Sequence, residues 1–543
     1  MELIDQHIKS IMEGCKERAR EAGLRFENET LEYIVTNRDL IELTPKVMIP
    51  TLYDYWVHDV EVLREKGKYE LYPSNPYETV INTRPAISYY NDNNPDWLNV
   101  MIFYHVLAHI DFFQNNLFFK HTWDEDLTGK ALSDKRSIAE LRAQKGRWLD
   151  YVIEFARGVD NLVGYYSELS RIHQPGKERI SSRTDYYFDV FLQTEQRSRI
   201  SHYLKEMERY NQSIRENGPM GEDLFFKHVT QHYPEFDALY EKFVKEKPGR
   251  RMDVMAFLMN HSRFLNKEKN RWMKQVVEVV RSTSLFLQPQ IRTKIMNEGW
   301  ASYWHEILFL SDDRIEGHEV DFARINSSVT TLPRVGLNPY ALGMNLFYYI
   351  EEMANKGRLG YTFQRITDTQ ARKNFDTGAG NGRTTIFDVR ENFSDFSFIQ
   401  TFLDQDFIDR HKLFVAGRRL VEDRMVWEYY VKSRKLEDYR KMLTDALYHP
   451  PHVVIETGKT NESLYLNHIF EGKPLVKEFI ANTLLGIEYL WGGPVELETS
   501  EVKAIRDIPV KGPGHVEGGI NKEVVWERVK YTMKDRKLQR IVI

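Results

Sequence analysis

Two histidines, His105 and His109, are four residues apart in a long apolar segment that runs from about Trp97 to Phe119. The segment has the length and composition of a buried helix, and at ~100° per residue both imidazoles fall on one stripe with Phe112 and Asn116. Two imidazoles one helical turn apart can bind a single metal ion through their ring nitrogens. The spacing therefore makes His105 and His109 candidate metal ligands.

Spacing alone is weak evidence for a metal site. The chain has 17 histidines in 543 residues, so roughly half a His-x-x-x-His pair is expected by chance, a frequency too high to prove a metal-ligand spacing. A second pair, His228 and His232, does occur, and its neighbours Lys227, Tyr233 and Pro234 are typical of an exposed helix end. We interpret this second pair as coincidental.

A third candidate ligand, Glu298, distinguishes the first pair. It lies on a helix predicted from Ile291 to Leu310, after a break at Pro289, with Ser302 and His305 on the same face. Large aromatic side chains cover the other side of this helix, so the polar stripe must be satisfied by a hydrogen-bond network or by a metal. If it is a metal, the two helices pack side by side and the tips of His105, His109 and Glu298 lie within ~5 Å of a common point.

The segment Asn297-Glu298-Gly299 resembles the third-ligand segment of gluzincin zinc peptidases, whose other two ligands come from a His-Glu-x-x-His motif. Here Val106 occupies the position of the catalytic glutamate, so ordinary gluzincin proteolysis is disfavoured. Two histidines and one carboxylate also match the facial triad of non-haem iron enzymes, which needs no such glutamate. The cofactor expected from the residues is one zinc or iron ion.

Other residues are candidates for the surroundings of the site. His305 would be a fourth ligand or an acid/base, and with the adjacent Glu306 it forms the candidate catalytic pair. Pro339 is well placed to open a helix over Leu342 to Lys356, with Asn338 as its N-cap. Alternatively, Asn338 and Tyr340 line the same cavity as His109, and the candidate cavity-lining residues are then Asn116, Ser302, Asn338 and Tyr340.

These residues need a mainly helical body to position them, and most of the first ~400 residues have helical periodicity, apart from one short strand-like run over residues 77–83. From about Phe407 on, strands alternate with amphipathic helices, which predicts a smaller α+β part. Its predicted elements include strands over 452–456, 463–470 and 495–499 and a helix over 474–491. We therefore expect a mainly α protein with a helical body over residues 1–405, containing gluzincin-like paired metal-site helices, and a C-terminal α+β accessory domain over residues 406–543. The glycine-rich segment 376–382 lacks the Lys-Ser/Thr of a phosphate-binding loop and is predicted to be a plain loop.

Composition excludes several classes of function. Lys and Arg total 75 and Asp and Glu total 80, so the net charge of 75 − 80 = −5 gives no case for nucleic acid as the main partner. The single cysteine, Cys15, excludes intrachain disulfides and Cys-rich metal modules. There is no N-terminal signal pattern and no run of ~18 apolar residues, so we expect a cytoplasmic protein without membrane insertion.

Longer motifs in the same segments resemble the stage V sporulation protein R (SpoVR) family. The segments that carry the resemblance are 109–116, 296–305 (Met-Asn-Glu-Gly-Trp-Ala-Ser-Tyr-Trp-His), 337–343 (Leu-Asn-Pro-Tyr-Ala-Leu-Gly), 406–414 and 492–499. They occur in the family order along nearly the whole chain. Two segments depart from the family: Asn326-Ser327-Ser328-Val329 stands where a His-His-Ser-Gly-like stretch is usual, and residues 171–247 are more divergent.

The resemblance implies a bacterial cytoplasmic protein with a role in forming the peptidoglycan of the spore cortex. Because the family also occurs outside spore formers, often beside a serine kinase, it further implies a stress response. It brings no established reaction. Two hypotheses therefore stand: a metal-dependent enzyme, either a hydrolase or of the non-haem iron type, and a non-catalytic regulatory or scaffolding protein that works with a serine kinase or another protein partner.

Overall fold

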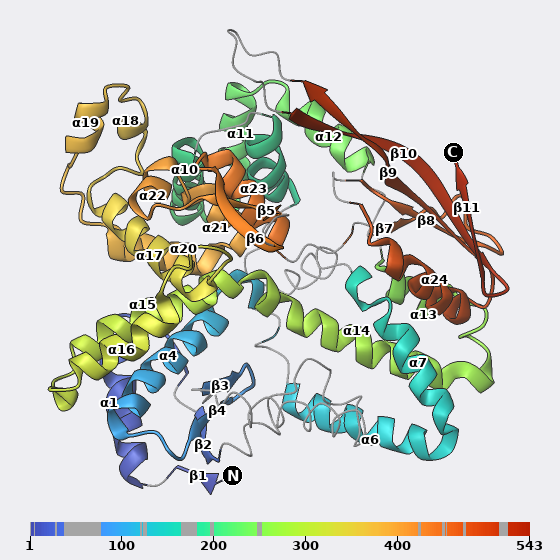
Figure 1. Ribbon diagram of the computed structural model, residues 1–543, viewed down its shortest axis with the longest axis horizontal. Helices are drawn as coiled ribbons and strands as arrows, with labels where there is room; N and C mark the ends of the chain where they lie inside the picture. The colour runs from blue at the N-terminus through green and yellow to red at the C-terminus, as the bar shows by residue number, and fades with distance from the viewer. Residues whose placement is uncertain are drawn as a thin grey trace.

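Helices dominate the computed structural model, and a strand-rich part follows them at the C-terminal end (Figure 1). This confirms the predicted class, mainly α with a smaller α+β part. The structure describes residues 2–4, 6–27, 30–36, 78–119, 122, 127–163, 182–195, 200–246, 252–421, 425–447, 451, 453–470, 474–509 and 520–543.

The helices that precede the strand-rich part fall into two runs. The first run is α1 (Gln6–Glu21), α4 (Asp96–Asn115), α6 (Leu127–Lys145), α7 (Arg147–Arg157), α9 (Ser182–Asp185), α10 (Ile200–Asn217), α11 (Gly221–His232), α12 (Phe236–Glu246), α13 (Val254–His261) and α14 (Arg271–Arg292). The second run is α15 (Lys294–Leu310), α16 (Glu319–Thr330), α17 (Pro339–Asn355), α18 (Tyr361–Gln364), α19 (Thr369–Asn374), α20 (Gly382–Asn392), α21 (Asp395–Phe402) and α22 (Gln405–Arg410).

Helix α4 is a core helix with apolar side chains on all its faces. Every residue from Leu98 to Phe113 is buried, which is the pattern of a helix surrounded by protein. It packs against α1 and α15, and α15 packs in turn against α17 (Figure 1). A polar side chain on the α4 face towards α15 is therefore removed from water.

Helices α15 and α17 cross at two glycines. A Cβ built on Gly299 would lie 2.3 Å from the carbonyl carbon of Gly343, and one built on Gly343 would lie 2.1 Å from the carbonyl oxygen of Ile295. Only glycine permits backbones to approach this closely. The crossing fixes the position of α15 at Gly299, the residue that follows Glu298.

A buried ion pair ties α4 to α15 and α20. Asp111 and Arg390 are both almost fully buried, and their nearest charged atoms are 3.4 Å apart. The indole N–H of Trp300 donates to the same oxygen of Asp111, Oδ2, at 2.8 Å. Burial raises the pKa of Asp111 to about 6 although the neighbouring Arg390 opposes the shift. Three helices are thus fixed by one carboxylate.

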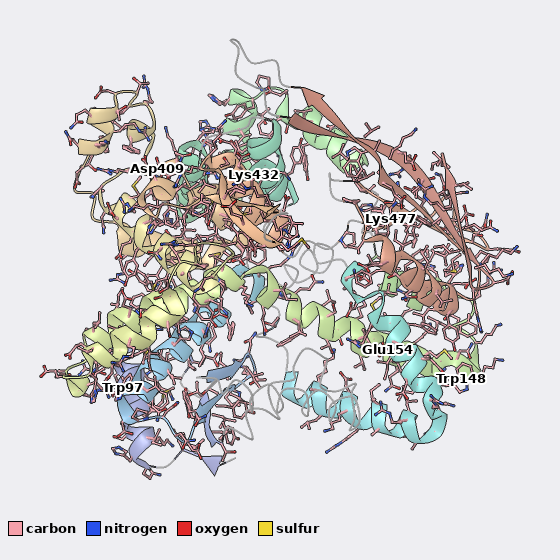
Figure 2. The ribbon with its side chains drawn as sticks, viewed as in Figure 1. Trp97, Trp148, Glu154, Asp409, Lys432 and Lys477 are labelled. Carbon is pink, nitrogen blue, oxygen red and sulfur yellow. The ribbon has the colours of Figure 1, made fainter. Side chains whose placement is uncertain are left out.

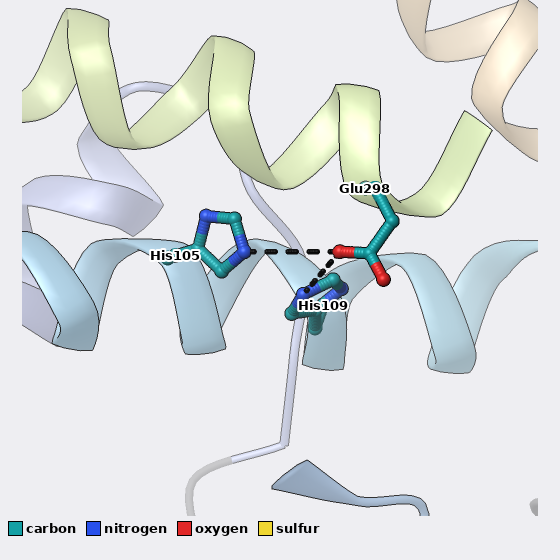
Figure 3. A group of neighbouring side chains, drawn as sticks. All are labelled: His105, His109 and Glu298. Atoms are coloured by element: carbon teal, nitrogen blue, oxygen red, sulfur yellow. Dashed lines mark ion pairs between the residues drawn. The ribbon is translucent and has the colours of Figure 1, made fainter. Parts of the chain in front are cut away.

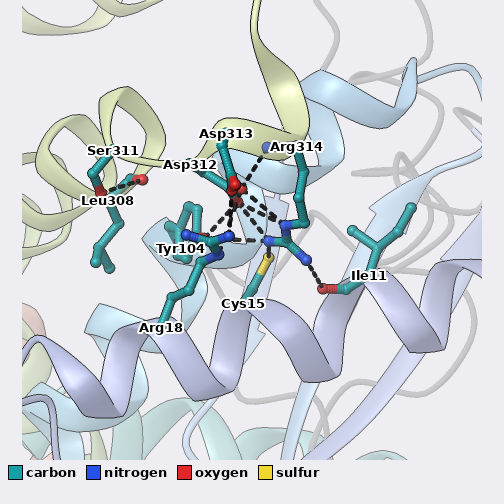
Figure 4. Close-up of polar contacts among 9 residues, drawn as sticks. All are labelled: Ile11, Cys15, Arg18, Tyr104, Leu308, Ser311, Asp312, Asp313 and Arg314. Carbon is teal, nitrogen blue, oxygen red and sulfur yellow. Dashed lines mark hydrogen bonds and ion pairs between the residues drawn. The ribbon is translucent and has the colours of Figure 1, made fainter.

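The single cysteine belongs to a polar cluster that joins α1 to α4 and to the end of α15 (Figure 4). The guanidinium of Arg314 donates to Cys15 Sγ at 3.3 Å and to Asp312, whose carboxylate also accepts from Tyr104 at 2.7 Å. Burial raises the pKa of Cys15 to about 11, so the side chain remains a neutral thiol. The cluster fixes the position of α4 at Tyr104, the residue before His105.

Two features of this body differ from the predictions. A four-stranded sheet, in the order β1-β2-β4-β3, contacts α4 through β3 and β4; its strands are β1 (Glu2–Leu3), β2 (Thr30–Val35), β3 (Glu78–Ile81) and β4 (Ala86–Asn91). Only β3 coincides with a predicted strand, the one over residues 77–83. The expected break at Pro289 is also wrong: α14 continues through it to Arg292. Thr293 forms the actual junction with α15, its hydroxyl donating to the carbonyl oxygen of Pro289 at 2.7 Å.

The C-terminal part contains two sheets. A ribbon of β5 (Val415–Val421) and β6 (Val426–Ser433) precedes α23 (Leu436–Ala446), and a five-stranded sheet has the order β11-β10-β9-β8-β7. Helix α24 (Lys477–Trp491) connects the parallel strands β8 and β9. The strands of the larger sheet are β7 (Val453–Ile455), β8 (Leu464–His468), β9 (Val495–Pro509), β10 (Ile520–Lys534) and β11 (Lys537–Val542).

The buried side chains of this C-terminal part are shared with the preceding helices. Phe407, Leu413 and Leu443 belong to the same hydrophobic core as α4, α15 and α17. The five-stranded sheet and α24 pack instead against α7, α13 and α14 in a second core, visible at the right of Figure 1. A cut between residues 405 and 406 would therefore divide both hydrophobic cores. The predicted accessory domain shares its buried side chains with the helical body.

Candidate metal centre

Helices α4 and α15 bring His105, His109 and Glu298 together, although about 190 residues of sequence separate them (Figure 3). One ligand atom from each lies within 4.8 Å of the other two. Glu298 Oε2 is 3.5 Å from His109 Nε2 and 4.0 Å from His105 Nε2. Both histidines are 4% exposed. The predicted side-by-side packing of the two helices and the clustering of the three tips are confirmed.

The hydrogen-bond partner of His109 determines which nitrogen faces Glu298 with a lone pair. Nδ1 of His109 is 2.9 Å from Oδ1 of Asn297, the residue before Glu298 on α15. A carbonyl oxygen can only accept, so Nδ1 carries the proton. In a neutral imidazole the other nitrogen is then unprotonated. His109 therefore presents the Nε2 lone pair to the carboxylate.

The same conclusion follows for His105 through a longer chain of contacts. Asn326 donates through Nδ2 to Glu306 at 2.6 Å, which leaves its Oδ1 to accept from His305 Nε2 at 2.9 Å. His305 Nδ1 is then an acceptor, and it lies 2.8 Å from His105 Nδ1. The proton between the two nitrogens belongs to His105, whose Nε2 lone pair is directed to Glu298.

Burial favours the neutral form of His105 and of His305. It lowers the pKa of His105 well below its ordinary value, and the nearby His109 and His305 add to that shift. Burial also lowers the pKa of His305 to about 4, although the hydrogen bond that His305 donates to Asn326 opposes the shift. Neutral imidazole is the form that binds a metal ion.

Three electron pairs thus converge on one buried point. Oε2 of Glu298 accepts no hydrogen bond from any residue that the structure describes. Lone pairs that face one another away from water repel unless a cation lies between them. The group is slightly wider than a closed zinc site, where two ligand atoms at ~2.1 Å from the ion lie at most ~4.2 Å apart. Binding an ion would draw the three side chains together.

Two predicted cavity residues adjoin the group. Ser302 lies one helical turn after Glu298 and is fully buried, and within the described ranges its hydroxyl has no hydrogen-bond partner. The ring of Tyr340, at the start of α17, stacks on that of His105 with a centroid distance of 6.2 Å and an interplanar angle of 18°. Ser302 and Tyr340 thus come from the two helices that cross at Gly299 and Gly343.

The two candidate catalytic residues, His305 and Glu306, lie behind His105. The three-residue ligand group does not include His305, whose two ring nitrogens contact His105 and Asn326. Glu306 accepts from Asn326 and, at 2.8 Å, from the hydroxyl of Tyr348. In this arrangement both residues orient His105, and their catalytic role stays a prediction.

Asn338 and Asn116 serve helix ends. Asn338 is the N-cap of α17, with Pro339 in the first turn, which confirms the predicted cap. Its amide also donates to the carbonyl oxygens of Val329 and Thr331. Asn116, the C-cap of α4, donates to the carbonyl oxygens of Arg390 and Phe393. Within the described residues, the hydrogen bonds of both side chains are to backbone groups, and none is to the three ligand candidates.

The other sequence candidates have ordinary structural roles. His228 and His232 are exposed near the end of α11, as expected. In the glycine-rich loop, the N–H groups of Gly378 and Gly382 donate to the side chains of Asp376 and Asn355, and that of Gly380 donates to the carbonyl oxygen of Asn355. Those donors are already used, which agrees with the prediction of a plain loop.

Sequence reasoning missed three residues that position the ligands: Asn297, Asn326 and Asp395. Asn297 stands next to Glu298, so its adjacency was a signal. Asn326 was visible only as a departure from the family pattern. Asp395 lies about 100 residues beyond Glu298 and accepts from the backbone N–H groups of Ile295 and Met296 at 2.8 Å each. No local pattern connects it to that helix.

Asp395 caps the N-terminus of α15 from a separate element, and its removal has a measurable cost. Burial raises the pKa of Asp395 to about 7, while the two backbone N–H groups oppose the shift. Asp395→Ala leaves both N–H groups buried without an acceptor, so we expect a loss of about 1–3 kcal/mol in the free energy of unfolding. Urea denaturation measures it. The exposed N-cap Asp368 of the short helix α19 is the control, and a loss for Asp395→Ala no larger than that for Asp368→Ala would contradict this role.

Comparison with known proteins assigns the chain to a family. The model of the family described as "SpoVR like protein" matches residues 3–449. The chain belongs to the SpoVR-like family. It is also 22% identical over 490 residues to an uncharacterized protein of Escherichia coli (strain K12), YcgB, with 86% of each chain covered.

The resemblance seen in the sequence motifs is therefore confirmed, and the matched span includes all three ligand candidates. No solved structure matches the chain, so the gluzincin-like character of the paired helices stays a prediction. Within the described residues, no helix combines the length and the apolar character needed to cross a membrane.

Proposed function

We propose that this SpoVR-like protein is a cytoplasmic metal-binding protein whose His105, His109 and Glu298 hold one zinc or iron ion. The observation that supports the proposal most is the convergence of two imidazole lone pairs and one carboxylate oxygen at a buried point. Each imidazole is oriented by an asparagine, His109 directly by Asn297 and His105 through His305 by Asn326. Metal-binding histidines are characteristically oriented in this way.

Three protein ligands leave coordination positions open, as enzymatic metal sites require. A bound zinc ion would supply Lewis acidity and an acidified water, and an iron ion would supply the chemistry of a facial triad. The side chains of the protein would hold the ion, exclude water on the side covered by Tyr340, and keep His105 neutral. Hydrolytic and non-haem iron chemistry are the two reaction classes that this ligand set fits.

The family suggests where such an enzyme acts. We place it in the formation of the spore-cortex peptidoglycan or in a stress response, with a serine kinase as a protein partner and without nucleic acid. The alternative is a regulatory or scaffolding protein that works with the kinase and has no catalytic metal. The two hypotheses differ in metal content, so the same measurement separates them.

The test is elemental analysis of the full chain purified without chelators. We expect about one equivalent of zinc or iron per chain, removable by dialysis against a chelator. Because an ion that binds only the folded state stabilises it, free metal at ~100 times its Kd should raise the free energy of unfolding by about 2.7 kcal/mol. Substoichiometric metal, together with an unchanged melting temperature on adding zinc or ferrous iron, would favour the regulatory alternative.

A further inference from the structure

The β5–β6 ribbon exposes an unusual amount of apolar surface. Trp427 and Tyr429 are 56% and 57% exposed on β6. The exposed large apolar residues of the ribbon and its turn are Leu420, Met425, Val426, Trp427, Tyr429, Tyr430 and Val431. Exposed apolar side chains gathered on one ribbon favour its association with another surface.

The ribbon also has an unpaired edge. One side of β6 pairs with β5, and no other strand of the described ranges pairs with its opposite side. Strand β5 is the inner strand, since it contacts α23 and follows the buried Leu413. Two strands alone are marginally stable, and an open edge offers backbone groups to another strand. The outer edge of β6 is therefore ready to extend the sheet.

The sequence of β6 is complementary to itself when it is reversed about Tyr430. Antiparallel pairing centred on Tyr430 places Glu428 opposite Lys432 of a second copy, and Tyr429 opposite Val431. Both charged side chains are exposed. Lys432, labelled in Figure 2, has no opposite residue on β5, because the register of the ribbon shifts beside it. Glu428 already pairs with Arg419 at 2.7 Å and can accept a second cation.

We propose that β6 pairs with β6 of a second copy around a two-fold axis at Tyr430, which joins two ribbons into one four-stranded antiparallel sheet. An isologous contact of this type uses the same patch on both chains. The apolar pairs supply the area, and the two Glu428–Lys432 pairs set the register. The ribbon contributes none of the three ligand candidates, so this pairing does not depend on a bound metal.

The test is sedimentation equilibrium of the full chain and of two single variants, Glu428→Lys and Lys432→Glu. We expect the wild type to form dimers at about 10–100 μM. Each variant places two like-charge pairs across the axis and should weaken the dimer about tenfold or more. An equimolar mixture of the two variants restores opposite charges at both positions, and the dimer should return as a heterodimer. Lys9→Glu, on the exposed face of α1, is the control for net charge.

The proposal would be overturned if the wild type remained a monomer over the whole concentration range of about 10–100 μM, even if the ribbon then proved to bind a different protein. It would also be overturned if both single variants dimerised as the wild type does, because the contact would then lie on another face. A third contradicting result is a mixture of the two variants that stays monomeric although circular dichroism shows that both are folded.

Discussion

Replacing His109 by alanine should abolish stoichiometric metal binding while the protein stays folded. The variant removes one of three ligands, whereas changes to residues that only orient a ligand already cost about 10–100-fold in affinity. We therefore expect the affinity for zinc or ferrous iron to fall by more than ~100-fold. Competition with a chromophoric chelator measures it, with circular dichroism as the check on folding.

The chain offers a matched control for this experiment. His228→Ala changes the first histidine of the other His-x-x-x-His pair, which is exposed on α11. That variant should keep the metal and the affinity of the wild type. If His109→Ala and His228→Ala bind metal equally well, the buried group is a hydrogen-bonded core and not a ligand set.

The second large effect is expected at the glycine crossing of α15 and α17. A methyl group on Gly299 would overlap the backbone of Gly343. Because both contacts are backbone atoms of packed helices, neither helix can relieve the overlap by rotating a side chain. Gly299→Ala should lower the free energy of unfolding by about 1–3 kcal/mol or more, the usual cost of overpacking a core.

The same substitution should also weaken metal binding, since it separates α15 from α17 beside Glu298 and Tyr340. Gly458→Ala is the control, because Gly458 lies in a turn and a Cβ there meets no atom within 4 Å. It should change the free energy of unfolding by no more than about 0.5 kcal/mol. Equal stability of the two variants in urea would contradict the close crossing.

The candidate site could be predicted from the sequence because its polar residues recur at helical spacing within two largely apolar helices. The spacing of His105 and His109, and the stripe of Glu298, Ser302 and His305, required only helical geometry. The residues that orient them could not be found in this way. Asn326 and Asp395 reach the site from other elements, and their contacts depend on tertiary packing that has no local pattern.

The fold shows a similar division. The strands and helix of the C-terminal part were predicted near 452–456, 463–470, 474–491 and 495–499 because Gly and Pro turns separate them, and the structure confirms them. Of the N-terminal sheet only β3 was predicted, over residues 77–83, because the other strands are short and partly polar. The predicted boundary at 405 rested on a change from helices to strands, but a change in element type does not reveal which core the new elements join.

The central claim is that one ion lies between His105, His109 and Glu298. A crystal of the full chain grown with zinc or ferrous iron, with anomalous data collected at the absorption edge of that metal, tests it most directly. If one ion lies there, we expect one strong anomalous peak at ~2.0–2.2 Å from His105 Nε2, His109 Nε2 and a carboxylate oxygen of Glu298. No peak between these three side chains, in a crystal whose helices α4 and α15 pack as described, would contradict it.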